Sequence, residues 1–127
     1  GLRGQANMGI YSVSKAAVIM MTQILAAELA PDNIQVNALA PGYVRTRFSQ
    51  AIWDDAARYA ELVQAIPQGR VAESSELVGM ALYLAAPASS FTTGATLVVD
   101  GGLTAAALYF AVLRLSGLRW RDVARRG

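Results

Sequence analysis

The stretch YSVSKAA, residues 11–17, decides the interpretation of this chain. Lys15, the only lysine, follows Tyr11 by four residues, so on a helix the phenol and the ammonium share one face about one turn apart. A cation held beside a phenol stabilises the phenolate, and such a pair is suited to transfer a proton. The spacing therefore predicts a general acid/base. The alternative from this spacing alone is an ordinary surface Tyr and surface Lys on an amphipathic helix.

Three further stretches follow along the chain. Residues 33–46 read NIQVNALAPGYVRT, residues 66–70 read IPQGR, and residues 90–102 read SFTTGATLVVDGG. In this order and at this spacing, these stretches and YSVSKAA resemble the short-chain dehydrogenase/reductase family over about residues 1–104. Several motifs in one order are far more specific than any of them alone.

The resemblance implies an α/β fold, namely the C-terminal part of a Rossmann-like doubly wound parallel sheet. About two strands and roughly three to four helices are expected, which makes the chain incomplete as a domain. Residues 1–103 are expected to form this part of the domain. Residues 104–127 are expected to be an apolar and then Arg-rich extension outside it.

The resemblance also assigns roles to individual residues. Tyr11 would give a proton to the developing alkoxide, and Lys15 would assist it and hydrogen-bond the nicotinamide ribose. The implied cofactor is NAD or NADP, and the implied substrate is a small carbonyl or alcohol. The residues placed against the cofactor are Tyr11, Lys15, Pro41, Gly42, Val44 and Thr46.

Two functional parts of the family have no match in this sequence. The glycines near the N-terminus do not follow a strand and open a helix, as a dinucleotide-binding turn must. The family's catalytic Ser would fall just before Gly1, and neither Ser12 nor Ser14 takes its place. We therefore expect part of an NAD(P)-dependent oxidoreductase that is not competent by itself. The alternative is a catalytically inactive truncated remnant or an oligomerisation module.

Composition limits the remaining possibilities. Cys and His are absent, so neither a disulfide nor a thiolate or imidazole metal site is expected, and no metal is predicted. The apolar fraction of 54% is high for a small domain by itself and suits a piece of a larger core or one face of an oligomer. By resemblance we expect a homo-oligomer formed through the helix at residues 9–30 and the last helix and strand. The sequence shows no signal peptide, which predicts a cytoplasmic location.

The basic charge lies in the C-terminal extension. From residue 104 onward the chain carries five arginines against one aspartate, so the overall net charge of +2 leaves the body mildly acidic. The apolar run at residues 108–113 is too short to span a membrane, but with the arginines it could lie on a membrane surface. Nucleic-acid binding and a simple solvated extension are the other interpretations of this tail.

Local patterns predict the order of the elements. Apolar periodicity predicts helices at residues 9–30 and 49–64, and a third helix capped by Ser74. Apolar runs predict strands at residues 34–40 and 95–100. These strands are expected to be neighbours, which leaves the first of them as an open apolar edge. We therefore expect the isolated chain to fold poorly without a partner.

Adjacent carboxylates occur at Asp54 and Asp55. Neighbouring residues on a helix point about 100° apart, which argues against a paired catalytic site. The pair is expected instead to complement the positive end of a helix.

Overall fold

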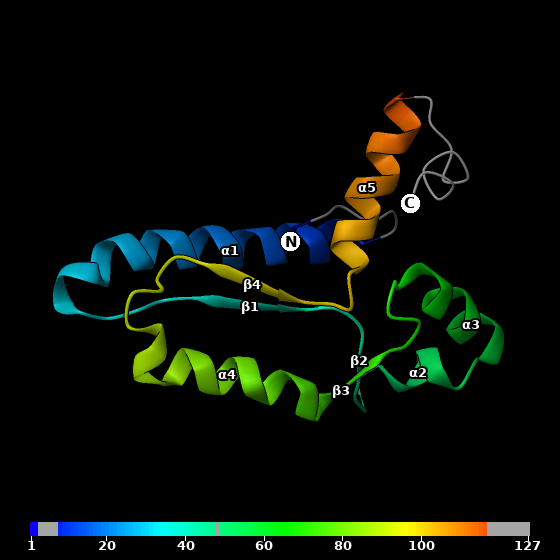
Figure 1. Ribbon diagram of the computed structural model, residues 1–127, viewed down its shortest axis with the longest axis horizontal. Helices are drawn as coiled ribbons and strands as arrows, with labels where there is room; N and C mark the ends of the chain where they lie inside the picture. The colour runs from blue at the N-terminus through cyan, green and yellow to red at the C-terminus, as the bar shows by residue number, and fades with distance from the viewer. Residues whose placement is uncertain (3–7, 48, 117–127) are drawn as a thin grey trace, which may run out of the picture.

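The computed structural model describes residues 1–2, 8–47 and 49–116, which contain both helices and strands (Figure 1). The α-helices are α1 (Gly9–Leu29), α2 (Gln50–Trp53), α3 (Ala56–Ala65), α4 (Val78–Ala85) and α5 (Leu103–Ser116). The β-strands are β1 (Ala38–Pro41), β2 (Val44–Arg45), β3 (Ala72–Glu73) and β4 (Thr96–Val99). Short 3₁₀ turns lie at η1 (Ala30–Asp32), η2 (Ser74–Leu77) and η3 (Pro87–Ser89).

Two pairs of parallel strands organise the chain. β1 pairs with β4 in a register that runs from Ala38 opposite Thr96 to Pro41 opposite Val99, and β2 pairs with β3. Figure 1 shows α1 along one side of the β1–β4 pair and α4 along the other. The predicted α/β architecture with two neighbouring parallel strands is confirmed. The short β2–β3 pair was not expected from the sequence.

The first predicted strand begins later than expected, at Ala38 instead of residue 34. The preceding residues direct their polar groups to the loop that leads into β4. Val36 N–H donates to the Thr93 hydroxyl at 3.1 Å, and the Asn37 side chain bonds the backbone of that loop on both sides. Together with the backbone hydrogen bond from the Gly94 N–H to the Val36 carbonyl at 2.7 Å, they join the two segments ahead of the regular strand pairing.

The single helix predicted over residues 49–64 is wrong, because the structure divides it into α2 and α3. Asp55 lies at the break in an extended conformation, and its Oδ1 accepts hydrogen bonds from the N–H groups of Ala57 and Arg58, both at 3.0 Å. Asp55 is therefore the N-cap of α3. The expectation that this acidic pair complements a helix start is confirmed for Asp55.

The predicted Ser74 cap is also wrong, because the cap is one residue earlier. Glu73 forms a reciprocal capping box with Glu76, whose carboxylate accepts the Glu73 N–H at 2.8 Å. The Ser74 hydroxyl instead donates to the Arg45 carbonyl at 3.2 Å. It thereby joins the start of η2 to the end of β2.

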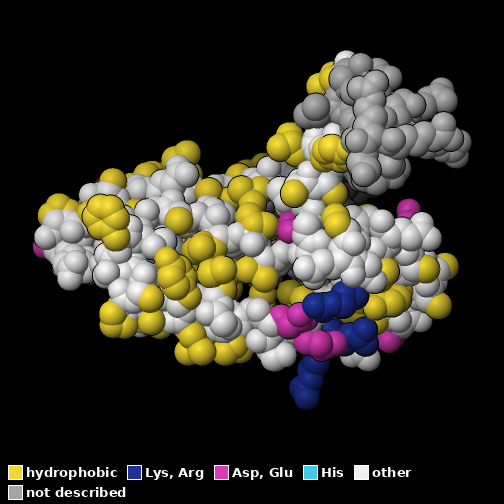
Figure 2. All heavy atoms as spheres, in the orientation of Figure 1, with side chains coloured by type: hydrophobic (Ala, Val, Ile, Leu, Met, Phe, Trp, Pro, Cys, Tyr) yellow, Lys and Arg dark blue, Asp and Glu magenta, His cyan; other side chains and the backbone are white. Residues whose placement is uncertain are grey.

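Helix α1 has almost the predicted bounds, and most of its apolar surface is exposed. Only Thr22 and Ala26 are buried on it, whereas Ile10 is 91% exposed. Figure 2 shows apolar side chains along α1 and α4, and charged side chains gathered near β2 and β3. The buried apolar residues in the described part of the chain are Ala26, Ile66 and Val71. An apolar helix with so little cover suits a surface that another polypeptide segment or subunit occupies.

Within the described residues, one segment passes a simple test for a membrane span. Gly9–Asp32 is long and apolar enough, with a mean hydropathy of 1.4. Core helices of water-soluble proteins pass the same test, so length and composition do not decide between the two.

The C-terminal extension begins as α5. Most of its predicted Arg-rich part falls on residues 117–127, outside the described residues. Its exclusion from the domain stays a prediction.

Candidate active site

The side chains of Tyr11 and Lys15 lie next to each other on α1. The Lys15 Nζ lies 5.4 Å from the centre of the Tyr11 ring, so the ammonium sits beside the phenol as the spacing predicts. Tyr11 is 53% exposed and therefore accessible to a ligand. The neighbouring Ser14 hydroxyl donates to the Tyr11 carbonyl at 2.8 Å. Ser14 is thus engaged with the helix backbone, as is common for serines within helices.

The same end of the molecule holds the loop that follows β1. Figure 1 shows that α1 runs opposite to β1, so the first turns of α1 lie at the end where β1 and β4 finish. The carboxyl ends of parallel strands are where open α/β sheets bind their ligands. Pro41 is the last residue of β1, and the predicted cofactor-contacting residues Gly42, Val44 and Thr46 follow it at this edge.

Gly42 marks a close approach between the ends of the two strands. Its N–H donates to the Val99 carbonyl at 2.9 Å, and a Cβ at this position would lie 2.7 Å from both Cα and Cβ of Asp100. Real Cβ atoms essentially never come so near to other heavy atoms. The glycine in the Pro-Gly pair is therefore required by packing against the chain itself.

The stretch IPQGR, residues 66–70, contacts the segment that follows β4. Gln68 N–H donates to the Gly101 carbonyl at 3.1 Å, and the Pro67 ring packs against Gly102. Gly101 and Gly102 have φ of 63° and 89°, which side chains rarely adopt. Three stretches that are far apart in the sequence thus meet at the carboxyl ends of β1 and β4.

Asp100 closes this junction and starts α5. Its carboxylate accepts hydrogen bonds from the N–H groups of Gly102 at 2.9 Å and Thr104 at 2.8 Å. Burial tends to raise the pKa of Asp100, but the hydrogen bonds from the side chain and backbone of Thr104 and from nearby N–H groups lower it overall. This role of Asp100 was not predicted from the sequence. An Asp just before the start of a helix was the available signal.

Thr46 is tied to the helix that follows it. The Thr46 and Ser49 hydroxyls lie 2.8 Å apart, and Ser49 Oγ also donates to the Val44 carbonyl at 2.9 Å. Ser49 therefore fixes the turn between β2 and α2. A hydroxyl has one donor and two acceptor positions, so the Thr46 hydroxyl can form a further hydrogen bond with a ligand.

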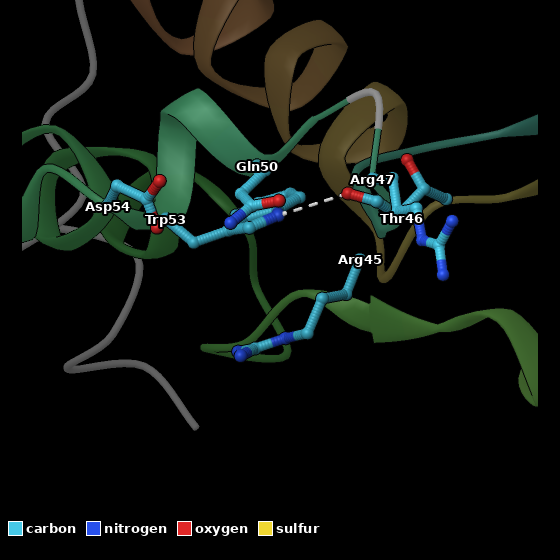
Figure 3. Close-up of a pocket in the computed structure, with 6 residues that line it drawn as sticks. All are labelled: Arg45, Thr46, Arg47, Gln50, Trp53 and Asp54. Carbon is cyan, nitrogen blue, oxygen red and sulfur yellow. Dashed lines mark hydrogen bonds between the residues drawn. The ribbon is translucent and has the colours of Figure 1, made fainter.

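An open pocket of about 500 Å³ lies beside Thr46. Figure 3 shows side chains of the chain segment around β2 on one side and side chains of α2 and its end on the other. The lining residues are Arg45, Thr46, Arg47, Gln50, Trp53 and Asp54. By the family resemblance, Trp53 and Phe48 are candidates for substrate-pocket residues, with core anchors as the alternative. Trp53 lines this pocket, and Phe48 falls outside the described residues.

Arg45 holds the pocket wall together. Its guanidinium carbon lies 5.9 Å from the ring centres of both Trp53 and Tyr59, and its Nε lies 3.3 Å from a Glu73 carboxylate oxygen. The two rings meet edge to face with centroids 6.3 Å apart. This cluster anchors α2 and α3 to the β2–β3 pair, and no local sequence pattern indicated it.

Known proteins resemble this chain in sequence over most of its described length. Residues 1–104 match the family model described as enoyl-(acyl carrier protein) reductase. The chain is 41% identical over 97 residues to dehydrogenase/reductase SDR family member 4 of Oryctolagus cuniculus, covering 76% of this chain and 37% of the relative. It is 42% identical over 103 residues to 5-keto-D-gluconate 5-reductase of Escherichia coli (strain K12), covering 81% of this chain and 41% of the relative.

A solved structure shares the fold. The gluconate 5-dehydrogenase of Burkholderia cenocepacia J2315, in complex with NADP and tartrate, superposes with a TM-score of 0.78 at 43% identity, covering 81% of this chain and 40% of the other. The chain thus spans about two fifths of the length of these relatives. That share agrees with the prediction that it carries part of a Rossmann-like domain. Its match over residues 1–104 and its identity with these relatives show that the chain belongs to the short-chain dehydrogenase/reductase family.

Proposed function

We propose that this chain supplies the proton-transfer pair and the nicotinamide-facing loop of an NAD(P)-dependent oxidoreductase that interconverts a carbonyl and an alcohol. The observation that carries the proposal is the Tyr11–Lys15 pair, with 5.4 Å between the ammonium and the ring centre, at the ligand-binding end of the sheet. The related enzymes that act on keto-gluconate and gluconate support this reaction type. A remnant without activity is not favoured by these similarities.

The donors at this end of the sheet fit a nicotinamide nucleotide. Lys15 offers three N–H donors, and Tyr11 and Thr46 offer hydroxyls, which suit ribose hydroxyls and a carboxamide. Backbone groups of Pro41, Gly42 and Val44 would lie against the ring. When bound, the cofactor supplies or accepts the hydride. The choice between NAD and NADP is made by residues that have no match in this chain.

Tyr11 and Lys15 would share the proton chemistry. As a substrate carbonyl is reduced, its oxygen gains negative charge, and the Tyr11 hydroxyl donates a proton to it. The Lys15 ammonium stabilises the phenolate that remains and hydrogen-bonds the ribose. In the direction of alcohol oxidation the phenolate takes the proton back. This exchange requires an accessible phenol, which agrees with the 53% exposure of Tyr11.

Exposed apolar helices support an oligomer as part of the proposal. The contacts would use α1 and the α4–β4 region, where Met20 is 56%, Ile24 is 49% and Leu82 is 63% exposed. Covering such side chains removes apolar surface from water and favours association. A cytoplasmic location is retained as a prediction, to be checked by cell fractionation.

The proposed function is tested by Tyr11→Phe in the natural protein that contains this chain. Oxidation of NADPH and of NADH is followed with a panel of small ketones and keto-sugars. Removing the hydroxyl should lower kcat/KM by about 10²-fold or more, because the proton donor is lost. Ser12→Ala, the matched control, removes a neighbouring hydroxyl on the same helix and should leave the rate unchanged. Unaltered turnover in the Tyr11 variant, or no turnover with any substrate, would contradict the proposal.

A further inference from the structure

Helix α5 lies almost entirely outside the part of the chain that matches the family. The family model ends at residue 104, whereas α5 runs from Leu103 to Ser116. Figure 1 shows α5 leaving the carboxyl end of β4 and extending away from the β1–β4 pair. The fold shared with the relatives therefore does not explain this helix.

The described part of α5 exposes apolar side chains. The helix is apolar except for Thr104, Arg114 and Ser116. Leu108 is 70% and Leu115 is 89% exposed, and no α5 residue whose exposure is described is buried. At about 1.5 Å per residue, its 14 residues give a length of about 21 Å, less than the roughly 30 Å of bilayer hydrocarbon. Such a helix is too short to span a membrane but long enough to lie along its surface.

Most of the arginines of this region come after the apolar part of α5. From residue 104 onward the chain carries five arginines against one aspartate. Arginines next to an apolar helix strengthen its binding to anionic lipid headgroups, because each charge near the surface adds an attraction. The same charge opposes a parallel contact between two copies of this helix. A nucleic acid would match the arginines but not the exposed leucines. An anionic lipid surface matches both.

We propose that α5 and the arginines after it attach the protein to the surface of an anionic lipid bilayer. Leu108 and Leu115 would enter the boundary between headgroups and acyl chains, and the arginines would contact the headgroups. This attachment is independent of the proposed oxidoreductase function. It is compatible with a cytoplasmic location, because the cytoplasmic leaflet carries anionic lipids.

Co-sedimentation of the natural protein with lipid vesicles tests the attachment. One set of vesicles contains phosphatidylcholine alone, and the other contains equal amounts of phosphatidylcholine and phosphatidylserine. We expect at least about tenfold tighter binding to the vesicles with phosphatidylserine, because several arginines act together. The difference should shrink at high salt, which screens exposed charges. Equal binding to both vesicles, or binding to neither, would overturn the proposal.

The double variant Leu108→Gln and Leu115→Gln separates apolar insertion from simple charge attraction. It keeps the net charge and a good helix propensity, and it should lower vesicle binding by at least about tenfold because apolar contact is lost. Ile34→Gln removes a side chain that is 49% exposed outside α5 and should leave vesicle binding unchanged. Full vesicle binding by the double variant, with unaltered circular dichroism, would overturn the role of α5. A double-stranded DNA oligonucleotide that displaces the unmodified protein from the vesicles would favour a nucleic-acid partner and also overturn it.

The charge contribution is tested by Arg125→Gln together with Arg126→Gln. This change should lower binding to the vesicles with phosphatidylserine and leave binding to phosphatidylcholine alone unchanged, because only the anionic surface attracts these charges. Arg58→Gln removes an arginine on α3 and serves as the control. If the control lowers binding as much as the pair does, net charge alone would account for the attraction, and the arginines after α5 would have no special role.

Discussion

Among single residues, Gly42 in the predicted cofactor-contacting set has no room for a side chain. The Pro-Gly pair was expected from the sequence to end a strand and face a nicotinamide. The structure adds a second reason for the glycine, because Asp100 occupies the space where a side chain would lie. The sequence could not indicate this contact, since the two residues are brought together only by strand pairing.

Gly42→Ala is expected to destabilise the protein by about 1–3 kcal/mol, because the new methyl group overlaps the backbone of Asp100. Urea unfolding measures the difference in free energy. Gly79→Ala is the matched control, since a Cβ there meets nothing within 4 Å and the residue lies in α4. That control should be neutral or stabilise by up to about 1 kcal/mol, as helix propensity predicts. Equal effects of the two substitutions would contradict the packing argument.

The candidate site divides into residues that a local pattern predicts and residues that it does not. Tyr11 and Lys15 were predicted because a helix brings residues four apart onto one face. Arg45 and Asp100 were not predicted as structural residues, since their partners Glu73 and Gly42 are distant in the sequence. Local periodicity carries no information about such pairs.

For the elements, the break between α2 and α3 shows how one side chain changes a helix. Apolar periodicity runs through residues 49–64 without interruption, yet Asp55 bonds two N–H groups of the next turn and starts a new helix. The capping geometry needs a non-helical residue, so the periodic pattern is overruled.

Asp55→Ala should therefore cost about 0.5–2 kcal/mol of stability, because two N–H groups of α3 lose their acceptor. Thermal unfolding followed by circular dichroism provides the measurement. Asp54→Ala removes the neighbouring carboxylate and should have a smaller effect, because Asp54 ends α2 through its backbone N–H and the substitution keeps that group. If both variants have the same unfolding temperature, the stability lost by Asp55→Ala would come from the removal of a negative charge and not from the loss of the N-cap.

The start of η2 is held by an ion pair whose strength depends on pH. Arg70 donates to both carboxylate oxygens of Glu76 at 2.7 and 2.6 Å, and this pair with the Glu73 N–H lowers the pKa of Glu76 from 4.5 to about 2. A lowered carboxylate pKa stabilises the folded state above the unfolded pKa. That contribution is lost as pH falls from about 4.5 through about 2.

Glu76→Gln should consequently lower the melting temperature most above pH 4.5, and the difference from the unmodified protein should shrink towards pH 2. Melting curves recorded across this interval test it. Glu61→Gln on α3, which forms no salt bridge with a described residue, serves as the control and should give a difference independent of pH. A constant difference for Glu76→Gln would show that its charge is not linked to folding.

Across the whole molecule, the exposed face of α1 is the largest departure from an ordinary small domain. The helix was predicted to take part in an oligomer contact, and the described chain alone covers few of its apolar side chains. These apolar side chains can be buried only by contact with another segment or subunit.

Ile24→Glu should weaken an oligomer formed through α1, because a carboxylate placed in an apolar interface loses its hydration. Light scattering after size-exclusion chromatography measures the mass. Gln23→Glu adds the same charge at an exposed polar position of the helix and should leave the mass unchanged. A protein that is monomeric before substitution, or unaffected by Ile24→Glu, would exclude this interface.

The sequence by itself determined what depends on near neighbours along the chain. These features are helix α1, the Tyr11–Lys15 pair and the strand that leads to the Pro-Gly pair. Helical and extended conformations have short periods, so a few residues suffice to indicate them.

Only the tertiary structure decided which of these parts meet. The β1–β4 pairing brings Gly42 against Asp100, and the β2–β3 pairing brings Arg45 beside Glu73. The resulting pocket leaves Arg47 free of salt bridges with described residues. Contacts of this kind depend on the distance between remote segments in space, which the periodicity of a single sequence does not record.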